Sequence, residues 1–582
     1  MKNYKIYIPL LMAWFSAHAQ SQFTNNGNVY IHNGGAISFY GNFINNGSYV
    51  DSGQVSSLVG SSAQQVGGSA ATTFKNLTLN NAAGCYLSAS ENIKGILTIT
   101  SGTFTTTGYS FTLLSNINGT ASIAPILGNF AGNITMQRYL GVGLTSWRFL
   151  CSPVTGATIS NWQDDFSTTG FPGSTTPTFP FVSVYTYTES VPGVNTYGYT
   201  APTNASNPIT PTVGFLCYIG PVPLTVDLTG PPVKFGQTFG VTYTPSAGAY
   251  NDGWVLLGNP YPSAIDWTSA AWSKHNVNNA VYVWNDALQQ YSSWVSGVSV
   301  NGGSNIIASS QSFWVQTNGA SPTLSCTENV KVSANPKFLM PDSIAVFSNL
   351  KLIMTGNGYK DETFIRFGNG ATNKFDAPLD AYKIFSSNTS VPGIASEDST
   401  LRDMSINSMP SVTSQLYIPI KALVGTSGNY SIKLDSSSVV PLGSCLELED
   451  KVTGVKTNID NFSAYSFSIS DTTKAARFIL HVAPCGTITG VNQLADPYQL
   501  NAFPNPTTGI VTINYEVNGQ KGDNAIMQLI DLGTGQIVME KSVPVNSSQM
   551  QIDLSGLANG AYALNMLSST NASEHIKIIK IK

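Results

Sequence analysis

The stretch Trp147–Trp162 reads WRFLCSPVTGATISNW, and a similar stretch, Trp254–Trp267, reads WVLLGNPYPSAIDW. Both begin with tryptophan, and both carry leucine three residues later and proline six residues later. Short runs of β-branched and aromatic residues followed by Pro and Gly turns are typical of β-strands joined by loops. The likeness therefore predicts that one β-unit occurs twice in this chain.

Four shorter segments continue the likeness in the same order: VYTYTE from Val184 with VYVWND from Val281, and GFLCYIG from Gly214 with SFWVQTNG from Ser312. Matches in one order along both stretches indicate a duplication of a whole unit, not of a single strand. We therefore predict a tandem, tryptophan-rich β-repeat over residues 133–337, with copy one at about 147–220 and copy two at about 254–320.

The alignment places Cys151 opposite Gly258 and Cys217 opposite Val315, so copy one carries two cysteines at positions where copy two has none. Exported chains can oxidise their thiols in pairs. We therefore predict a disulfide between Cys151 and Cys217 within copy one. Two buried free thiols are the alternative.

The tryptophans are concentrated in this repeat, and two roles are open to them. Aromatic side chains fill cores, and they also offer flat apolar faces on which sugar rings stack. We assign the equivalent pairs, Trp147 with Trp254 and Trp162 with Trp267, to two equivalent cores. The less symmetrical aromatic residues are the better candidates for ligand contacts: Tyr261 in the turn GNPYPS, Trp272, Trp284, Trp294, Tyr282 and Tyr291.

Composition limits the class of protein. Charged residues make up 10% of the 582 residues, against about 25% in an average soluble protein, and there are 53 glycines. Few helix formers and many β-branched or turn-forming residues favour an all-β fold. A formal net charge of −4 supplies no basic surface for nucleic acid, so we expect no nucleic-acid partner.

Two further regions show strand patterns. Residues 20–132 consist of short strands punctuated by Asn-Gly and Ser-Gly, and runs such as LTITSGTFTTT look like successive rungs. We expect a β-solenoid there, with a β-sandwich as the alternative. Residues 338–485 contain seven or more alternating strands, among them ETFIRFG and QLYIPIKAL. This pattern predicts an antiparallel, jelly-roll-like β-sandwich.

Residues 1–19 have the pattern of a signal peptide. Lys2 and Lys5 precede an apolar run from about Ile6 to Phe15, and Ala17-His18-Ala19 provides a small-x-small cleavage site. A membrane anchor is the alternative, but the apolar run is too short to span a bilayer. We therefore expect removal of this segment by signal peptidase.

Residues able to carry catalytic chemistry show none of the familiar spacings. None of the five histidines lies in H-E-x-x-H or in a recognisable G-x-S-x-G context, and no P-loop is present. Glu447 and Glu449 share one face of an expected strand, but LELEDKVTG indicates solvated acids before a turn. We expect no cofactor and no metal site. An extracellular hydrolase using acids such as Asp164 or Glu447 is the alternative function.

The last part of the chain is a small β-unit behind a linker, residues 486–498. Its first segment, NAFPNPTTGIVTINYEV at Asn501–Val517, combines a Pro-Asn-Pro turn with a strand of period two. Because about seven strands are expected in residues 499–582, this part can form a β-sandwich with its own core.

Motif residues lie in order along this last part: Pro504, Asn505, Pro506 and Gly509; Asp531 and Gly535; Gly560 and Tyr562; Lys577 and Lys580. With them it resembles the type A C-terminal sorting domain of the type IX secretion system. The resemblance implies an Ig-like β-sandwich, export by the Sec machinery into the periplasm of a Gram-negative bacterium, and recognition by the outer-membrane machinery. It also implies a protein that is secreted or displayed on the cell surface.

The sequence thus favours a non-enzymatic protein outside the cell. The solenoid-like segment, the duplicated aromatic unit and the missing catalytic spacings indicate adhesion or the binding of an unknown extracellular ligand, either glycan or protein. The secreted hydrolase remains the alternative.

Overall fold

The computed structural model describes residues 22–141, 145–191, 195–220, 223–245, 252–332, 348–460, 464–469, 476–485, 498–517, 524–532, 534, 536–544, 549–567 and 573–581. The chain divides into two compact units, Met1–Ile488 and Thr489–Lys582. The expected signal peptide and most of the expected linker lie outside the described residues. No helix among the described residues is both long and apolar enough to cross a membrane.

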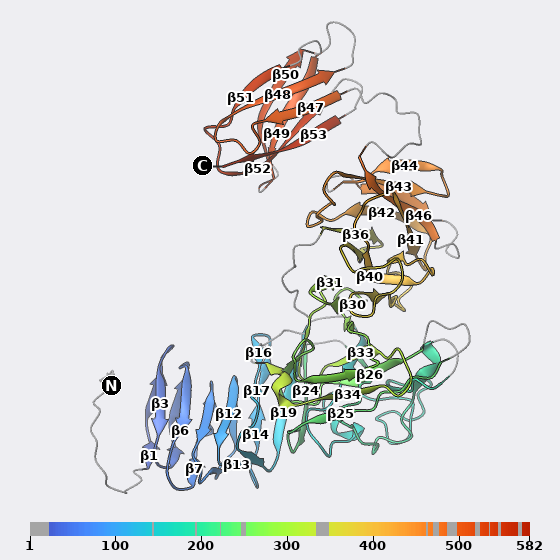
Figure 1. The fold of residues 1–582 in the computed structure, drawn as a ribbon. Helices are drawn as coiled ribbons and strands as arrows, with labels where there is room; N and C mark the ends of the chain where they lie inside the picture. The colour runs from blue at the N-terminus through green and yellow to red at the C-terminus, as the bar shows by residue number, and fades with distance from the viewer. Residues whose placement is uncertain are drawn as a thin grey trace. The chain divides into compact units, whose positions relative to one another are not determined.

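The first unit begins with a β-solenoid of three sheets, seen as the blue strands in Figure 1. The first sheet contains β1 (Phe23–Asn25), β4 (Phe43–Asn45), β7 (Gln64–Gly67), β10 (Cys85–Leu87), β13 (Thr103–Thr105) and β18 (Asn129–Ala131). The second contains β2 (Asn28–Ile31), β5 (Ser48–Asp51), β8 (Thr73–Phe74), β11 (Glu91–Ile93), β14 (Phe111–Leu113), β19 (Ile134–Leu140) and β24 (Leu224–Gly230). The third contains β3 (Ala36–Phe39), β6 (Val55–Leu58), β9 (Leu77–Asn80), β12 (Ile96–Ser101) and β17 (Ser122–Ile123), and a hairpin, β15 (Ser115–Asn116) with β16 (Gly119–Thr120), lies beside them.

Successive coils place like residues above one another. Phe23 pairs with Phe43 in parallel register, and their rings stack with centroids 5.7 Å apart. Two residues on, Asn25 donates to the side chain of Asn45 at 2.8 Å. Such ladders bury apolar and amide side chains inside each coil, which explains how a segment so poor in charge forms a core. The solenoid prediction is confirmed.

Copy one and copy two each form an antiparallel sheet with the same strand order. Copy one contains β20 (Ser146–Leu150), β23 (Phe215–Ile219), β21 (Val184–Tyr187) and β22 (Tyr199–Thr200), with short 3₁₀ helices η1 (Ile159–Trp162) and η2 (Asn195–Gly198). Copy two contains β26 (Trp254–Gly258), β33 (Ser312–Gln316), β29 (Val281–Asn285), β30 (Gln290–Val295) and β31 (Val298–Val300). In both sheets the strand of the last matching segment, β23 or β33, lies between the strands of the two earlier segments, β20 and β21 or β26 and β29. The duplication in the sequence therefore has a counterpart in the topology.

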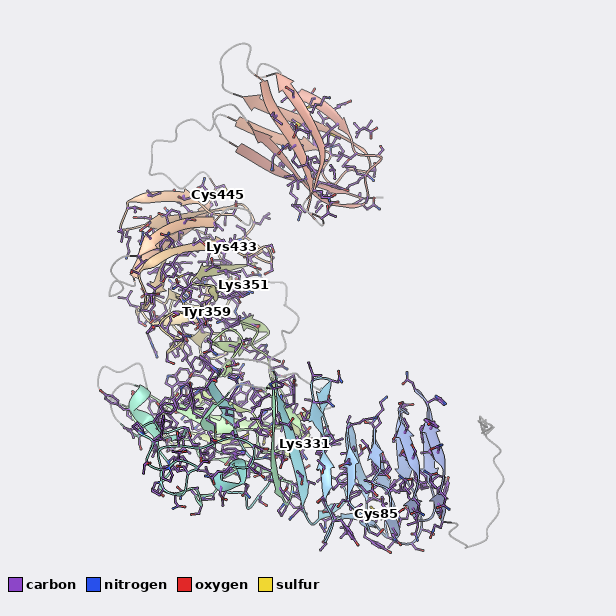
Figure 2. The ribbon with its side chains drawn as sticks, turned by 180° about the vertical axis from the view of Figure 1, so that it is seen from behind. Cys85, Lys331, Lys351, Tyr359, Lys433 and Cys445 are labelled. Atoms are coloured by element: carbon purple, nitrogen blue, oxygen red, sulfur yellow. A yellow bond between two sulfur atoms is a disulfide. The ribbon has the colours of Figure 1, made fainter. Side chains whose placement is uncertain are left out.

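Smaller sheets flank copy two. One contains β25 (Gln237–Phe239), β34 (Thr323–Cys326) and β28 (Trp272–His275), and the other β32 (Ile306–Ile307), β27 (Ala264–Asp266) and β35 (Lys331–Val332), with η3 (Glu328–Val330) before the last strand. Figure 2 labels Lys331, whose buried ammonium contacts the carboxylate of Glu328. The same carboxylate accepts a hydrogen bond from the Ile126 N–H at 3.0 Å, so it ties copy two to the solenoid.

The predicted disulfide between Cys151 and Cys217 is wrong, because both are free, buried thiols. Cys217 lies opposite Arg148, and Cys151 is three residues beyond Arg148. That offset amounts to roughly 10 Å along the strand, whereas disulfide-bonded Cα atoms lie within about 7 Å of each other. Cys151 instead faces copy two, where its Sγ donates to the Asn259 carbonyl at 3.3 Å.

The third part of this unit is a β-sandwich built from one continuous sheet of eleven strands. Its strands are, in spatial order, β44 (Val455–Asn458), β43 (Ser444–Asp450), β46 (Ala476–Pro484), β41 (Leu416–Leu423), β39 (Gly393–Glu397), β40 (Asp403–Met409), β37 (Tyr359–Phe367), β36 (Ser348–Gly356), β42 (Gly428–Leu434) and β45 (Ala464–Ile469), with β38 (Ala381–Tyr382) on β40. One pair, β37 with β40, runs parallel where we expected only antiparallel pairs. A disulfide joins Cys445, which Figure 2 labels, to Cys485, the residue directly after β46.

The second unit is a sandwich of two antiparallel sheets. They contain β47 (Tyr498–Phe503), β48 (Ile510–Val517) and β51 (Gln549–Asp553), and β50 (Ile537–Pro544), β49 (Asn524–Asp531), β52 (Gly560–Leu567) and β53 (Ser573–Lys580). Apolar residues from both sheets, among them Val511, Ile513 and Leu564, form its own core. The predicted all-β class, with a C-terminal sandwich, is confirmed.

One buried acid in the solenoid gives a pH-dependent prediction. Glu91 is 1% exposed, and burial raises its pKa from 4.5 to about 7, although a hydrogen bond from the Thr72 N–H opposes the shift. A carboxyl whose pKa is raised on folding destabilises the fold once it ionises, so stability falls as the pH rises from 4.5 to about 7. Glu91→Gln should therefore stabilise the solenoid at pH 8 by on the order of 3 kcal/mol and much less at pH 4.

Hydrogen exchange of peptides from residues 72–113, compared between the two proteins at both pH values, measures this difference. An equal effect of the substitution at both pH values would contradict it.

Candidate functional site

A cavity of about 730 Å³ lies where the two copies and the β-sandwich meet. Its lining is dominated by aromatic residues: Trp147, Phe149, Tyr185, Tyr187, Tyr199, Trp254, Trp284, Tyr291, Trp314, Tyr382 and Phe385. Leu216, Lys383, Ile384, Ser387, Leu401, Arg402 and Asp403 complete it. Cavities of this size with mostly aromatic walls and a few polar groups are the usual form of small-ligand sites.

Strand alternation explains how the repeat builds these walls. Residues two apart on a strand share a face, so Trp147 and Phe149 line the cavity while Arg148 between them does not. Three equivalent pairs of the two copies line it: Trp147 and Trp254, Tyr187 and Trp284, Leu216 and Trp314. The duplication therefore supplies two similar aromatic faces to one cavity.

The aromatic rings hold one another edge to face. Tyr187 meets Trp314 with centroids 4.6 Å apart and an interplanar angle of 81°. Tyr187 also meets Tyr199 at 5.3 Å, and Trp284 meets Tyr291 at 5.1 Å. This arrangement is the favoured one for aromatic pairs, and it fixes the rings before any ligand arrives.

Several polar groups of the wall can face a ligand. Trp284 is 6% exposed, and its indole nitrogen is buried without a hydrogen-bond partner among the described residues, so the tyrosine hydroxyls are the better donors. Burial raises the pKa of Tyr187 to about 12, and burial likewise raises the pKa of Tyr291 to about 12. Both hydroxyls therefore stay protonated at neutral pH and can donate hydrogen bonds.

The sandwich supplies a stacked wall. The rings of Phe375 and Tyr382 lie nearly parallel, with centroids 4.0 Å apart. The guanidinium carbon of Arg402 lies 3.9 Å from the Tyr382 ring centroid, a cation–π contact. The neighbouring charges are paired, Asp403 with Lys421 at 2.7 Å and Lys383 with Asp361 at 2.6 Å. The result is a flat, polar-edged wall opposite the two copies.

The cavity reaches the surface at Ser387 and Leu401. Leu401 is 67% exposed and has a φ of +62°, a conformation that costs a bulky side chain about 1 to 2 kcal/mol. The turn is held by Asp398, whose carboxylate accepts from the N–H groups of Thr400 and Arg402 at 2.8 and 3.0 Å. An exposed apolar side chain held under strain at the mouth of a cavity points to a functional role.

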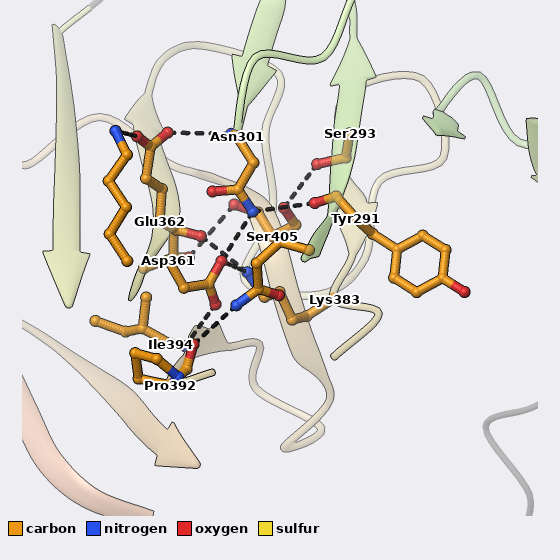
Figure 3. Close-up of polar contacts among 12 residues, drawn as sticks. Tyr291, Ser293, Asn301, Asp361, Glu362, Lys383, Pro392, Ile394 and Ser405 are labelled. Carbon is orange, nitrogen blue, oxygen red and sulfur yellow. Dashed lines mark hydrogen bonds and ion pairs between the residues drawn. The ribbon is translucent and has the colours of Figure 1, made fainter. Parts of the chain in front are cut away.

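A buried polar seam fixes copy two against the sandwich (Figure 3). Asp361 accepts hydrogen bonds from Lys383 Nζ at 2.6 Å, Asn301 Nδ2 at 2.8 Å and the Ile394 N–H at 2.8 Å. Asn301 also donates its backbone N–H to Glu362 at 3.0 Å. Because Asp361 is fully buried and Asn301 comes from copy two, separating the two parts would leave buried charge without partners.

Of the predicted ligand-contact residues, Trp284 and Tyr291 line the cavity. Tyr261 does not, because it is 0% exposed and its hydroxyl donates to the Phe235 carbonyl at 2.7 Å. Trp294 is buried in the core on the far face of copy two. Trp272 packs there too, and its indole N–H donates to the Asp266 carbonyl at 2.8 Å.

The other predicted aromatic residues divide differently. Trp162 and Trp267 are buried in cores, as we predicted, but Trp147 and Trp254 line the cavity. Tyr282, a further ligand-contact candidate, is buried in the cluster behind the cavity wall. The missed lining residues on the repeat could have been found, because they occupy alternate positions of the matching segments. Tyr382 and Arg402 carry no such signal.

The acids considered for hydrolysis do not gather at this cavity. Glu447 pairs with Lys456 at 3.2 Å, and Glu449 contacts His481 at 2.7 Å. Asp164 adjoins Asp165, whose pKa burial raises to about 6. Among the described residues there is no group of three metal-ligating side chains.

Residues of the sorting motif mostly hold the second unit together. Asn505 donates to the Lys577 carbonyl at 2.6 Å and accepts from the Ile579 N–H at 2.8 Å, which joins the Pro-Asn-Pro turn to β53. A Cβ atom on Gly509 would lie 2.6 Å from Ser555 Oγ. Pro504 and Pro506 are exposed on either side of Asn505.

The remaining motif residues have smaller roles. Tyr562 is buried and donates its hydroxyl to the Ala558 carbonyl at 2.7 Å. Asp531 accepts from the Thr534 N–H at 3.1 Å, and Lys580 reaches Asn559 at 3.4 Å. A Cβ atom on Gly560 would meet no atom within 4 Å, so close packing does not require glycine there. Gly535 lies outside the described residues.

Two family models match the chain. Residues 50–482 match the family described as Domain of unknown function (DUF8693), and residues 501–582 match the Secretion system C-terminal sorting domain. No curated protein matches the chain.

Three solved structures share low similarity with it. A duf3244 family protein with an immunoglobulin-like β-sandwich fold from Bacteroides vulgatus has 14% identity over 14% of this chain and 94% of its own, with a TM-score of 0.12. An FMN-binding β-glucuronidase from Facaelibacterium prausnitzii has 12% identity over 27% of this chain and 32% of its own, with a TM-score of 0.12. Dimeric latent PorU from Porphyromonas gingivalis has 15% identity over 40% of this chain and 30% of its own, with a TM-score of 0.14. The chain spans only about a third of the latter two, and TM-scores this low support no inference about it.

The sorting domain implies contact with the type IX secretion machinery and delivery to the cell surface or the extracellular space. Because the DUF8693 model matches residues 50–482, most of the sequence, the chain belongs to the DUF8693 family, and its residues 501–582 form a type IX secretion C-terminal sorting domain.

Proposed function

We propose that this protein is a non-enzymatic binding protein that recognises a glycan outside the cell through the aromatic cavity. The observation that carries the proposal is the convergence of aromatic faces from both copies on one preformed cavity. The C–H faces of pyranose rings stack on aromatic side chains, while sugar hydroxyls need donors and acceptors nearby.

The polar groups of the cavity suit sugar hydroxyls. The protonated tyrosine hydroxyls of the wall, such as that of Tyr187, both donate and accept hydrogen bonds. The paired charges at Asp403 and Lys383 keep the wall polar without a large net charge. Adhesion to a glycan-coated surface follows if the protein stays attached to the cell.

Export completes the proposal. The N-terminal pattern supports Sec-dependent transfer to the periplasm and cleavage by signal peptidase, after which the sorting domain directs passage of the outer membrane. The protein would then meet its glycan outside the cell.

A panel of hexasaccharides of glucose, xylose, mannose and N-acetylglucosamine tests glycan binding by calorimetry. At least one of these hexasaccharides should bind the full-length protein. Trp147→Ala should weaken that binding by about tenfold, because one aromatic face for stacking is lost. Trp272→Ala is the matched control, because Trp272 is also half-buried but lies outside the cavity. Equal effects of both substitutions would contradict the proposal, and cleavage of a probe would favour the hydrolase.

Leu401 offers a second test at the mouth. Leu401→Gly relieves the positive φ, so we expect the protein to become more stable by up to about 1 kcal/mol. The same change should weaken binding of the hexasaccharide severalfold, because an apolar contact is removed. Thermal unfolding and calorimetry measure the two effects, with the exposed Leu442→Gly as control. Unchanged affinity would show that the strained residue does not touch the sugar.

The sorting domain is tested by removal of Asn501–Lys582. The truncated protein should accumulate in the periplasm, because it lacks the domain that the outer-membrane export machinery recognises. Fractionation followed by immunoblotting locates it. Efficient appearance of the truncated protein in the medium would refute this route.

A further inference from the structure

A second pocket of about 420 Å³ adjoins the aromatic cavity. The two share Tyr382 and Arg402, so the stack of these side chains forms a common wall. The second pocket differs in chemistry, because much of its lining comes from the amide side chains of Asn278, Gln316 and Asn318. We call it the amide pocket.

The amides form a directed chain. Asn318 Nδ2 donates to Asn278 Oδ1 at 2.6 Å, and Asn278 Nδ2 donates to Gln316 Oε1 at 3.0 Å. Gln316 Nε2 then donates to the Asp252 carbonyl at 2.9 Å. Each amide has two donors and two acceptor sites, so this chain fixes the orientation of the side chains while leaving capacity for further hydrogen bonds.

The floor of the amide pocket is again aromatic. Phe375 lines it and stacks on Tyr382 with centroids 4.0 Å apart. Oriented amides beside an aromatic ring fit the hydroxyls and the apolar face of a sugar residue. An apolar ligand would use none of the amides' remaining hydrogen-bonding capacity and would shield it from water, which disfavours such a ligand.

We propose that the aromatic cavity and the amide pocket are two subsites of one binding track, divided by the Tyr382–Arg402 stack, and that the ligand is a linear oligosaccharide long enough to occupy both. This inference rests on the proposed glycan-binding function and specifies its substrate as a chain, not a single sugar. Asn318 is exposed at the pocket, so it meets the part of the chain beyond the dividing wall.

Calorimetry with the di-, tri-, tetra- and hexasaccharide of the best-binding series tests the track. Affinity for the wild-type protein should rise about tenfold or more from the shortest to the longest member, because only the longer chains reach the second subsite. Asn318→Ala should leave disaccharide affinity unchanged and weaken hexasaccharide binding by about threefold to tenfold. Trp147→Ala should weaken binding at every length.

The exposed Asn429→Ala, on the sandwich and outside both pockets, is the matched control and should behave as the wild type. An affinity independent of chain length would overturn the inference, and so would an Asn318→Ala protein that keeps the full gain with length. Both outcomes leave binding in the aromatic cavity intact. Failure of every oligosaccharide to bind would instead refute the proposed function itself.

Discussion

The close approach of Cys151 to Gly258 is the constraint on which the rest of the binding unit depends. A Cβ atom at Gly258 would lie 2.5 Å from the Cβ of Cys151, so only glycine allows the two copies to meet at this point. Around it, the Cys151 N–H donates to the Ser310 carbonyl at 3.1 Å and the Gly258 N–H to the Thr212 carbonyl at 3.0 Å. The edges of two sheets can therefore join, and their aromatic faces turn toward the same space.

The sandwich closes that space through strands buried on both sides. Ile365 belongs to the core of the sandwich, while its neighbour Phe364 packs in the cluster shared with the two copies. The Asp361 seam adds specificity to this contact, because a charged group without its partners would be far more costly than a displaced apolar one. The solenoid is joined on the other side by Glu328, so the parts of the first unit support one cavity.

The sequence predicts what depends on local pattern and repetition. The recurring turns and strands predicted the solenoid, and the matching segments predicted the duplication. The Pro-Asn-Pro segment and the motifs after it indicated the sorting domain. Features set by contacts between distant segments could not be predicted. The proline-rich turn predicted an exposed Tyr261. In the structure Lys331 Nζ lies 4.9 Å from the centroid of its ring, and the Phe235 carbonyl accepts a hydrogen bond from its hydroxyl. Likewise, no local signal shows that Tyr382 and Arg402 face the cavity or that Cys151 turns away from Cys217.

The disulfide between Cys445 and Cys485 has a mechanical consequence. Cys485 directly follows β46, which pairs with β41 on one side and β43 on the other. Any tension applied through the C-terminal domain enters the sandwich at this residue and would peel β46 away one hydrogen bond at a time. The covalent link passes the load to β43, so both strands must be pulled out together. A protein held at its C-terminal end thus resists this peeling force and keeps the fold that carries its cavity.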